Sequence, residues 1–466
     1  YIDSLAFKVD GQKVAWEYHP DHIDICKLTL NKPIAPGQTV KITTPFRVKI
    51  PDSFSRLGHV NQQYQITQWY PKPAVYDKNG WHEMPYLDQG EFYSEFGTFD
   101  VNITVPQNYV VGATGNLQNE EEKAFLDKLA KETLTIDNFP SDDPFPESSS
   151  EMKTLRYHQE NVHDFAWFAD KRYHVLTGEV TLPESGRKVA LYALFNNRDS
   201  KAWKVTVVDG ALSAGAGMEY PTITVLGSSN PFFLEIVTVH EIGHNWFYGI
   251  LGSNEREFAW MDEGLNSFYE WRYISEKYPE SAIAGVNMES IDNDFATTLI
   301  EYFEVFEHSY REQYELGYLL TARTNEDQPC QLHSNDFTGT NYGTMVYMKT
   351  AFLLNYLRNY LGTEQFDKTM KQYYLQWQFK HPQPEDVRSL FEEVTGQDLS
   401  WFFDTSIKTT NKQDYKIKSL KKETLTIKNK GKVNGPIPLT FVKGDKEQID
   451  WVDGFEDEKT IDISGK

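Results

Sequence analysis

The stretch HEIGHNWFYG, residues 240–249, is the most informative part of the sequence for both the fold and the function. On an α-helix, residues four apart are rotated by about 40° and rise by about 6 Å, so His240 and His244 project from one face. Two imidazoles placed in this way can bind one Zn²⁺. Glu241 then lies beside the metal, where a carboxylate can accept a proton from a bound water. The stretch therefore predicts a helix that carries a catalytic metal.

A catalytic zinc normally has three protein ligands and one open position. Glu263, separated from His244 by eighteen residues, opens the next helical segment and is the expected third ligand. Glu270 lies two turns further along the same helix, where it can accept the second N–H of a ligand histidine. The sequence thus predicts one Zn²⁺ per chain, held by His240, His244 and Glu263.

The segments around this motif are helical. SNPFFLEIVTVHEIGHNWFYG has Asn230 as the expected N-cap, Pro231 at the first helical position and Gly249 as the expected end. Two more helices are expected in DEGLNSFYEWRYISEKYP, residues 262–279, and MVYMKTAFLLNYLRNYLG, residues 345–362. From about residue 230 to 405 the chain is therefore expected to be mainly helical.

The first third of the chain has the pattern of strands. GTFDVNITVP, residues 97–106, alternates apolar and polar residues with a period of two, which is typical of a half-buried antiparallel strand. Residues 40–50 and 132–138 are also predicted as strands, residues 120–131 as a short helix, and residues 139–151 as a loop. After residue 410 short strands are expected again.

The expected organisation is a multidomain α+β fold. An N-terminal antiparallel β-sheet domain covers residues 1–185 and a mainly helical catalytic domain with a small sheet covers residues 186–408. A C-terminal β-sandwich-like module covers residues 409–466. A chain of 466 residues is too long for one compact core, which agrees with this division.

Charge and composition exclude several partners. The net charge is −22 and no block of Lys or Arg occurs, which argues against nucleic acid and anionic lipid. No run of eighteen apolar residues is present, so no membrane-spanning segment is expected. The sequence starts at Tyr1 without a signal-like stretch, which suggests a processed chain, and its two cysteines do not decide the compartment.

HEIGHNW with WMDEG, residues 260–264, resembles the aminopeptidase N family of gluzincin zinc metallopeptidases. That family has H-E-x-x-H, eighteen residues and then a glutamate within an N-E-G-like motif, and here Asp262 replaces the asparagine. The resemblance implies a thermolysin-like catalytic domain and removal of N-terminal residues from peptides. It is compatible with export to the periplasm or outside of a bacterium, although no residue decides this.

GAGMEYP, residues 215–221, resembles the exopeptidase motif of the same family. The resemblance makes Glu219 the residue that binds the free α-amine of the substrate, and a carboxylate there suits an ammonium group. It also places Gly215, Gly217 and Met218 along the substrate, because glycines let a peptide backbone approach an edge strand closely. Tyr220 stands where the family has asparagine.

Two further blocks carry the resemblance. NYGTMVYMKTAFLLNYL, residues 341–357, is similar to the family's Y-x-K-G helix, which implies that the Tyr347 hydroxyl stabilises the oxyanion. Tyr342 competes for this role, and Thr350 replaces the usual glycine. TQWYPKPAVYD, residues 67–77, occupies the place of the family's T-Q-x-x-P stretch, which implies that Gln68 also reaches the substrate N-terminus.

Other functions stay open at this point. An endopeptidase with an open cleft requires that Glu219 binds no amine, and the family's large C-terminal helical domain is replaced here by the short β module. A catalytically silent binding protein is less compatible with the intact metal motif. Only RDSKAWK, residues 198–204, stands where the family has a longer helix, so a deletion or missing residues are both compatible with the sequence. The oligomeric state and preferred N-terminal residue are not encoded in a recognisable pattern.

Overall fold

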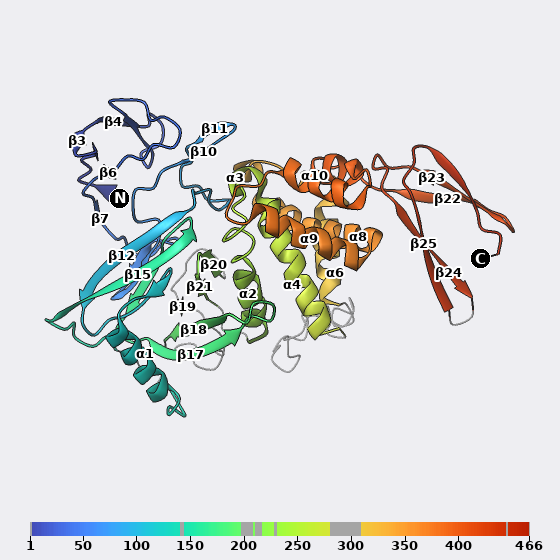
Figure 1. Cartoon of the computed structure of the whole chain (residues 1–466). Helices are drawn as coiled ribbons and strands as arrows, with labels where there is room; N and C mark the ends of the chain where they lie inside the picture. The colour runs from blue at the N-terminus through green and yellow to red at the C-terminus, as the bar shows by residue number, and fades with distance from the viewer. Residues whose placement is uncertain are drawn as a thin grey trace. The chain divides into compact units, whose positions relative to one another are not determined.

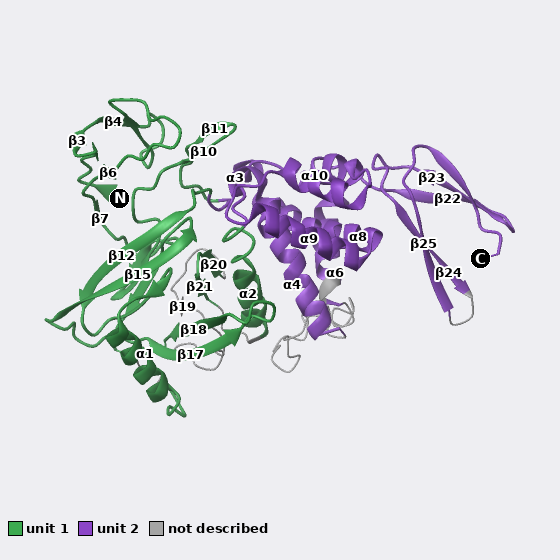
Figure 2. Cartoon of the chain, viewed as in Figure 1, with its two compact units in different colours: residues 1–88, 93–250 green, residues 89–92, 251–466 purple. Residues whose placement is uncertain are grey.

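The computed structural model describes residues 2–139, 144–196, 208–209, 217–227, 231–279, 309–443 and 446–465. The chain divides into two compact units, residues 1–88 with 93–250 and residues 89–92 with 251–466 (Figure 2). The predicted domain boundaries at residues 185 and 408 stay predictions. None of the helices within the described ranges is both long and apolar enough to cross a membrane.

The first unit begins with short antiparallel pairs. Their strands are β1 (Ile2–Asp3), β2 (Lys8–Val9), β3 (Gln12–Lys13), β4 (Ala15–Tyr18), β5 (Cys26–Thr29), β6 (Ile42–Thr43), β7 (Arg47–Val48), β10 (Val75–Asp77) and β11 (Gly80–His82). The strand predicted over residues 40–50 is thus two short strands, β6 and β7. Pro45 lies between them and lacks the N–H that a continuous strand needs.

Two sheets form the main β region of this unit (Figure 1). One has the order β13-β16-β9-β8 and the other the order β12-β15-β14. The bounds are β8 (Gly58–Val60), β9 (Gln63–Ile66), β12 (Gly97–Pro106), β13 (Val110–Ala113), β14 (Asn116–Leu117), β15 (Met152–Val162) and β16 (Trp167–Asp170). In β12 the apolar residues are the more buried ones, as predicted: Ile103 and Val105 join a core with Leu155 and Phe165.

A third sheet of the first unit carries the metal-motif helix. Its order is β17-β18-β19-β21-β20, with strands β17 (His174–Thr181), β18 (Lys188–Phe195), β19 (Val208–Asp209), β20 (Gly217–Tyr220) and β21 (Ile223–Leu226). Among the residues that the structure describes, strand β20 is at the edge of this sheet and pairs with β21 alone. The helix α2 (Pro231–Gly243) packs against both β20 and β21.

Two sequence predictions in this unit are wrong. The helix α2 ends at Gly243 and not at Gly249, because the N–H groups of Asn245 and Trp246 bond to carbonyls only three residues back, in a tight turn. The predicted N-cap Asn230 lies outside the described residues. Residues 132–138 are no strand: α1 (Glu120–Thr133) runs into this segment, and the Leu134 N–H still bonds to the Ala130 carbonyl (3.1 Å).

The described part of the second unit is mainly helical up to residue 407. Its helices are α3 (Glu255–Phe258), the 3-10 helix η2 (Ala259–Met261), α4 (Glu263–Lys277), α6 (Tyr310–Ala322), the 3-10 helix η4 (Ser334–Asp336), α7 (Gly339–Asn341), α8 (Thr350–Leu361), α9 (Thr363–Trp377) and α10 (Pro384–Thr395), with two π-helices, η5 (Tyr342–Lys349) and η6 (Trp401–Ile407). The helix predicted over residues 345–362 therefore starts inside η5 and continues as α8.

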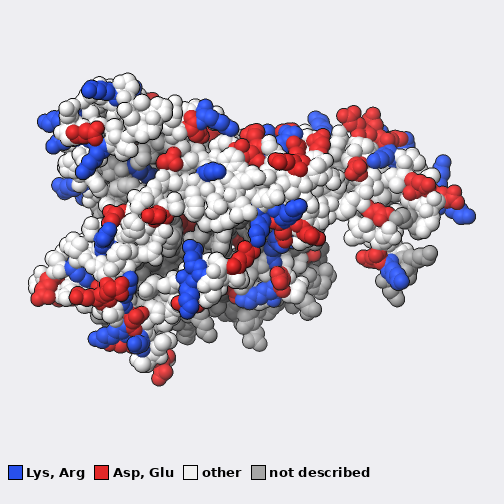
Figure 3. All heavy atoms as spheres, viewed as in Figure 1, with Lys and Arg blue, Asp and Glu red and all other residues white. Residues whose placement is uncertain are grey.

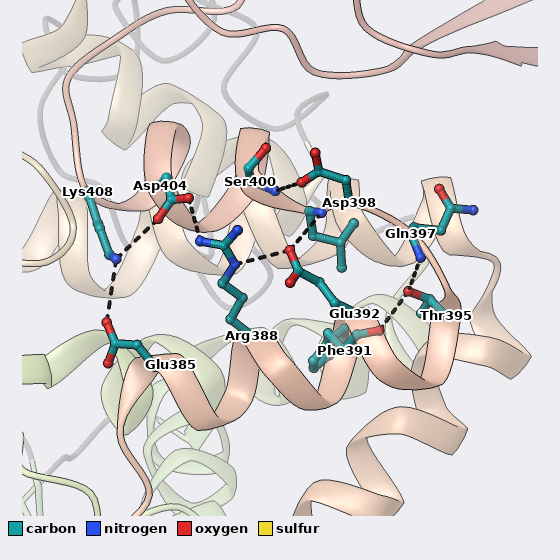
Figure 4. Close-up of polar contacts among 11 residues, drawn as sticks. Glu385, Arg388, Phe391, Glu392, Thr395, Gln397, Asp398, Ser400, Asp404 and Lys408 are labelled. Atoms are coloured by element: carbon teal, nitrogen blue, oxygen red, sulfur yellow. Dashed lines mark hydrogen bonds and ion pairs between the residues drawn. The ribbon is translucent and has the colours of Figure 1, made fainter.

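A charged network joins α10 to η6 at the end of the helical region (Figure 4). Arg388 donates to Glu392 (3.1 Å) and to Asp404, and Asp404 also pairs with Lys408 (3.2 Å). Each exposed pair of this kind contributes roughly 0–1 kcal/mol. The network fixes the segment from which the C-terminal strands depart.

The C-terminal strands form two small sheets. They are β22 (Tyr415–Leu420), β23 (Thr424–Asn429), β24 (Ile437–Lys443), β25 (Lys446–Val452) and β26 (Glu458–Asp462), ordered β22-β23-β26 and β24-β25. Leu425, Ile427 and Ile437 form their common core. Acidic and basic side chains are interspersed on the face seen in Figure 3. The β-rich start, helical middle and β-stranded end confirm the predicted multidomain α+β fold.

Candidate active site

The two motif histidines of α2 point at a common position. His240 Nε2 and His244 Nε2 are 3.1 Å apart, and the two ring planes are at 81°. Two nitrogens bound to one tetrahedral zinc at about 2.0–2.1 Å would lie about 3.3 Å apart. His244 is buried and His240 is partly exposed, so the pair is open to a ligand from one side. Both residues therefore fit a zinc ion, as the spacing predicts.

The turn after α2 holds the orientation of His244. Its Nδ1 faces the carbonyl oxygen of Phe247 at 3.3 Å, which is how a second contact fixes the tautomer of a metal-binding imidazole. The next residue, Tyr248, has a positive φ of 85°, and its carbonyl accepts from His163 Nε2 (2.8 Å). His163, which lies outside the metal motif, thus holds the turn that orients the predicted ligand His244.

The carboxylate of Glu241 lies directly against the edge strand β20. A methyl group on Gly217 would overlap the Glu241 carboxylate and would come within 2.8 Å of its Cγ. Glycine at this position therefore leaves room for the side chain that is expected to act as the base. This explains the predicted importance of Gly217 in steric terms.

Glu219 belongs to the same face of β20. Residues two apart on a strand share a face, so Glu219 and Gly217 are directed alike, and Met218 is directed oppositely. The cross-strand partner of Glu219 is Thr224, whose hydroxyl lies 3.5 Å from the carbonyl oxygen of Glu241. Glu219 is buried. The carboxylates of Glu219 and Glu241, which have different predicted roles, thus lie on one side of an edge strand. Gly215 lies outside the described residues.

Replacing Gly217 with Ala is expected to displace the Glu241 carboxylate. We expect kcat to fall by about 10²-fold, because a misplacement of about 1 Å in a catalytic group has this effect. Zinc content, measured by atomic absorption, should be unchanged. Gly97→Ala is the matched control, since a methyl group there meets no atom within 4 Å. An unchanged kcat in Gly217→Ala would show that Glu241 does not need this space.

The second unit places Glu263 at the start of α4, close to the π-helix η5. Glu263 is buried, and Tyr347 donates a hydrogen bond to its Oε1 (2.5 Å). Gly264 makes this approach possible, because a methyl group there would meet the carbonyl oxygen of Val346 at 2.7 Å and also the side chain of Thr350. The D-E-G stretch therefore packs α4 directly onto η5.

The π-helix brings the two candidate tyrosines together. A π-helix bonds residues five apart, and Tyr342 and Tyr347 are five apart with ring centroids at 5.9 Å. Burial, followed by the charge of Glu263, raises the pKa of both phenols. The Tyr347 hydroxyl therefore lies against the predicted third ligand, and the Tyr342 ring packs against the Tyr347 ring. Thr350, which replaces the family's glycine, donates to the Met345 carbonyl and closes this helix (3.0 Å).

Glu270 is buried two turns along α4. Its Oε1 accepts a hydrogen bond from the hydroxyl of Tyr314 on α6 (2.7 Å). Its predicted contact with a ligand histidine stays a prediction.

Gln68 is held by a residue that the sequence did not suggest. Its Nε2 donates to Asp164 Oδ2 (3.2 Å), and Gln68 itself has a positive φ of 50°. Tyr70 and Lys72 bind the same carboxylate (2.9 Å each). Because Asp164 lies 96 residues beyond Gln68, no local pattern could have revealed the pair.

Comparisons with known proteins support the metal motif. Residues 228–406 match the peptidase family M1 domain. Aminopeptidase M1-D of Oryza sativa subsp. japonica is 22% identical over 186 residues, which is 40% of this chain and 18% of that protein. Aminopeptidase N of Lactococcus lactis subsp. lactis is 23% identical over 170 residues, 36% of this chain and 18% of that protein. The chain thus spans a small part of the length of these curated relatives.

Solved structures show the same fold at low identity. Aminopeptidase A of Legionella pneumophila, in complex with aspartic acid, matches with a TM-score of 0.65 and 13% identity over 99% of this chain and 52% of that chain. An M1 zinc metallopeptidase of Deinococcus radiodurans matches with a TM-score of 0.58 and 14% identity over 89% of this chain and 85% of that one. Residues 228–406 are thus similar to the peptidase family M1 domain, and the chain shares its fold with solved M1 metallopeptidases.

Proposed function

We propose that this protein is a zinc-dependent aminopeptidase that removes N-terminal residues from peptides. The observation that carries the proposal is the arrangement of Glu219 and Glu241 on one side of the edge strand β20. One carboxylate suits a substrate ammonium and the other a base. In the described part of the sheet, β20 is the last strand, and an extended peptide can add to such an edge as a further strand.

We propose that His240, His244 and Glu263 hold one zinc ion per chain. Their nitrogen and oxygen atoms are a donor set that suits a metal ion, and all three residues lie within the matched family segment. When bound, zinc supplies Lewis acidity and lowers the pKa of water. The metal content of the purified protein, measured by atomic emission, should be close to one zinc per chain, and both His240→Ala and Glu263→Ala should lower it.

Side chains of the protein would bind the substrate amine, transfer the proton and stabilise the oxyanion. Glu219, with the oxygen of Gln68, would hold the substrate ammonium, so that only one residue precedes the scissile bond. Glu241 would accept the proton of the attacking water and pass it to the leaving amine. Tyr347 would donate to the oxyanion that forms on the scissile carbonyl. Because Glu219 and Glu241 lie on one side of β20, little reorganisation of these two groups would be needed during the reaction.

Tyr347→Phe is expected to lower kcat by about 10²–10³-fold with a small change in KM, since the donor acts mainly in the transition state. Tyr342→Phe is the matched control, because Tyr342 lies in the same π-helix and its ring packs against that of Tyr347. We expect it to lower kcat much less. Steady-state kinetics on one peptide checks both. A larger loss in Tyr342→Phe would assign the oxyanion role to Tyr342.

The second candidate function is an endopeptidase, and it predicts different products. A peptide of ten residues should be shortened one residue at a time from its N-terminus by an aminopeptidase. Mass spectrometry over time would show this ladder. Internal fragments in the earliest samples would instead support the endopeptidase. Export in a bacterium stays a prediction of the family resemblance.

A further inference from the structure

The buried carboxylate of Asp164 accepts hydrogen bonds from three side chains of the T-Q-W-Y-P-K stretch, residues 67–72. Asp164 Oδ2 accepts from Gln68 Nε2 (3.2 Å) and Lys72 Nζ (2.9 Å), while Oδ1 accepts from the Tyr70 hydroxyl (2.9 Å) and the Phe165 N–H (2.8 Å). Its exposed fraction is 1%. Four donors on two oxygens leave little freedom for any of them.

The ionisation state of Asp164 determines which groups can form hydrogen bonds with it. Burial opposes its ionisation, but the nearby Lys72 ammonium and the hydrogen bonds hold the pKa of Asp164 below its ordinary value. An ionised carboxylate can only accept hydrogen bonds. A carboxamide beside it must therefore present its NH₂ group, and its oxygen then lies on the opposite branch, directed away from Asp164.

Gln68 lies next to the strand that carries Glu219. Strand β16 pairs with β9, whose last residue is Ile66, and Phe168 of β16 packs against the ring of Tyr220 (centroids 6.4 Å apart). Gln68 follows Ile66 by two residues in the chain, and Glu219 precedes Tyr220. The predicted amine-binding residues are thus carried by two segments that both lie beside β16.

We propose that Asp164 is a positioning residue that holds the Gln68 carboxamide with its oxygen toward the substrate ammonium. The inference rests on the proposed aminopeptidase function. An ammonium group needs an acceptor, and a carboxamide turned by 180° would offer it a donor instead. Asp164 thereby decides whether Gln68 attracts or repels a free N-terminus, although it does not itself touch the substrate.

The test measures recognition of the amine without turnover. Isothermal titration calorimetry of the zinc-loaded protein compares leucine hydroxamate with the same hydroxamate lacking its α-amine. The ratio of the two Kd values reports the amine contact alone. In Asp164→Asn, an amide can either accept from Gln68 or donate to it, so the ratio should fall about tenfold, the size expected of a hydrogen bond to a charged group.

Two further variants separate positioning from loss of structure. Tyr70→Phe removes a hydrogen bond to the other oxygen of Asp164, so the ratio should equal that of the wild type. In Asp164→Asn/Gln68→Glu, the new carboxylate has two acceptor oxygens and needs no fixed orientation, so the ratio should recover. A wild-type ratio in Asp164→Asn, or no recovery in the double variant, would overturn the inference. A wild-type protein with no preference for the amine would overturn the proposed function itself.

Discussion

Glu241→Gln is expected to lower kcat by about 10³–10⁴-fold while the protein retains its zinc, because the change removes a base that contributes roughly this much and leaves the ligands intact. A glutamine side chain has nearly the volume of a glutamate, so the packing of this position against Gly217 is preserved in the variant. The measurement is kcat on a peptide with a free N-terminus, together with metal content by atomic absorption.

The matched control for this prediction is Glu276→Gln. Glu276 is an exposed glutamate of α4 and has no part in the proposed reaction, so kcat should be unchanged. Loss of activity together with loss of zinc would make Glu241 a ligand and not the base. Activity within a few-fold of the wild type would require another base.

Glu219→Ala should have the second-largest effect, and it should act on the amine. We expect kcat/KM for a free-amine peptide to fall by about 10²-fold or more, since truncation of one partner of a buried charged pair costs about 2–5 kcal/mol. Both a higher KM and a lower kcat are expected, because the amine contact also sets the register of the scissile bond. Steady-state kinetics on free and N-acetylated forms of one peptide provides the measurement.

Glu160→Ala is the matched control for Glu219→Ala. Glu160 is an exposed glutamate of β15 in the same unit, so its removal should leave kcat/KM unchanged. An equal loss on the free and the acetylated peptide in Glu219→Ala would indicate a general disturbance of β20. The assignment of Glu219 as the amine anchor would then fail.

Local patterns predicted the parts of the site that lie within one element. The spacing of His240 and His244 follows from the helix repeat, and their nitrogens do converge. The packing of Glu241 against Gly217 needs a helix and a strand to meet, so the sequence indicated the glycine and not its steric reason. Likewise, the position of Glu263 at the start of a helix was predicted, and its contact with Tyr347 was not.

Other features depend on tertiary contacts and could not be predicted. The π-helix η5 arises where Gly264 lets α4 pack tightly against Val346 and Thr350, which no periodicity of residues 342–349 reveals. The early end of α2 depends on a turn whose Tyr248 carbonyl is held by His163, 85 residues earlier. Asp164, the partner of Gln68, lies 96 residues away in sequence. Hydrophobic patterning therefore predicts helices and strands, while polar contacts between distant segments determine how the side chains of the site are arranged.

One measurement tests the aminopeptidase account most directly. A peptide with a free N-terminus and its N-acetylated twin are incubated with the zinc-loaded protein, with Glu241→Gln as the control. The account predicts cleavage of the free peptide alone, after its first residue, and no cleavage by the variant. Equal cleavage of both peptides by the wild-type protein would contradict it and would establish an endopeptidase in which Glu219 binds no amine.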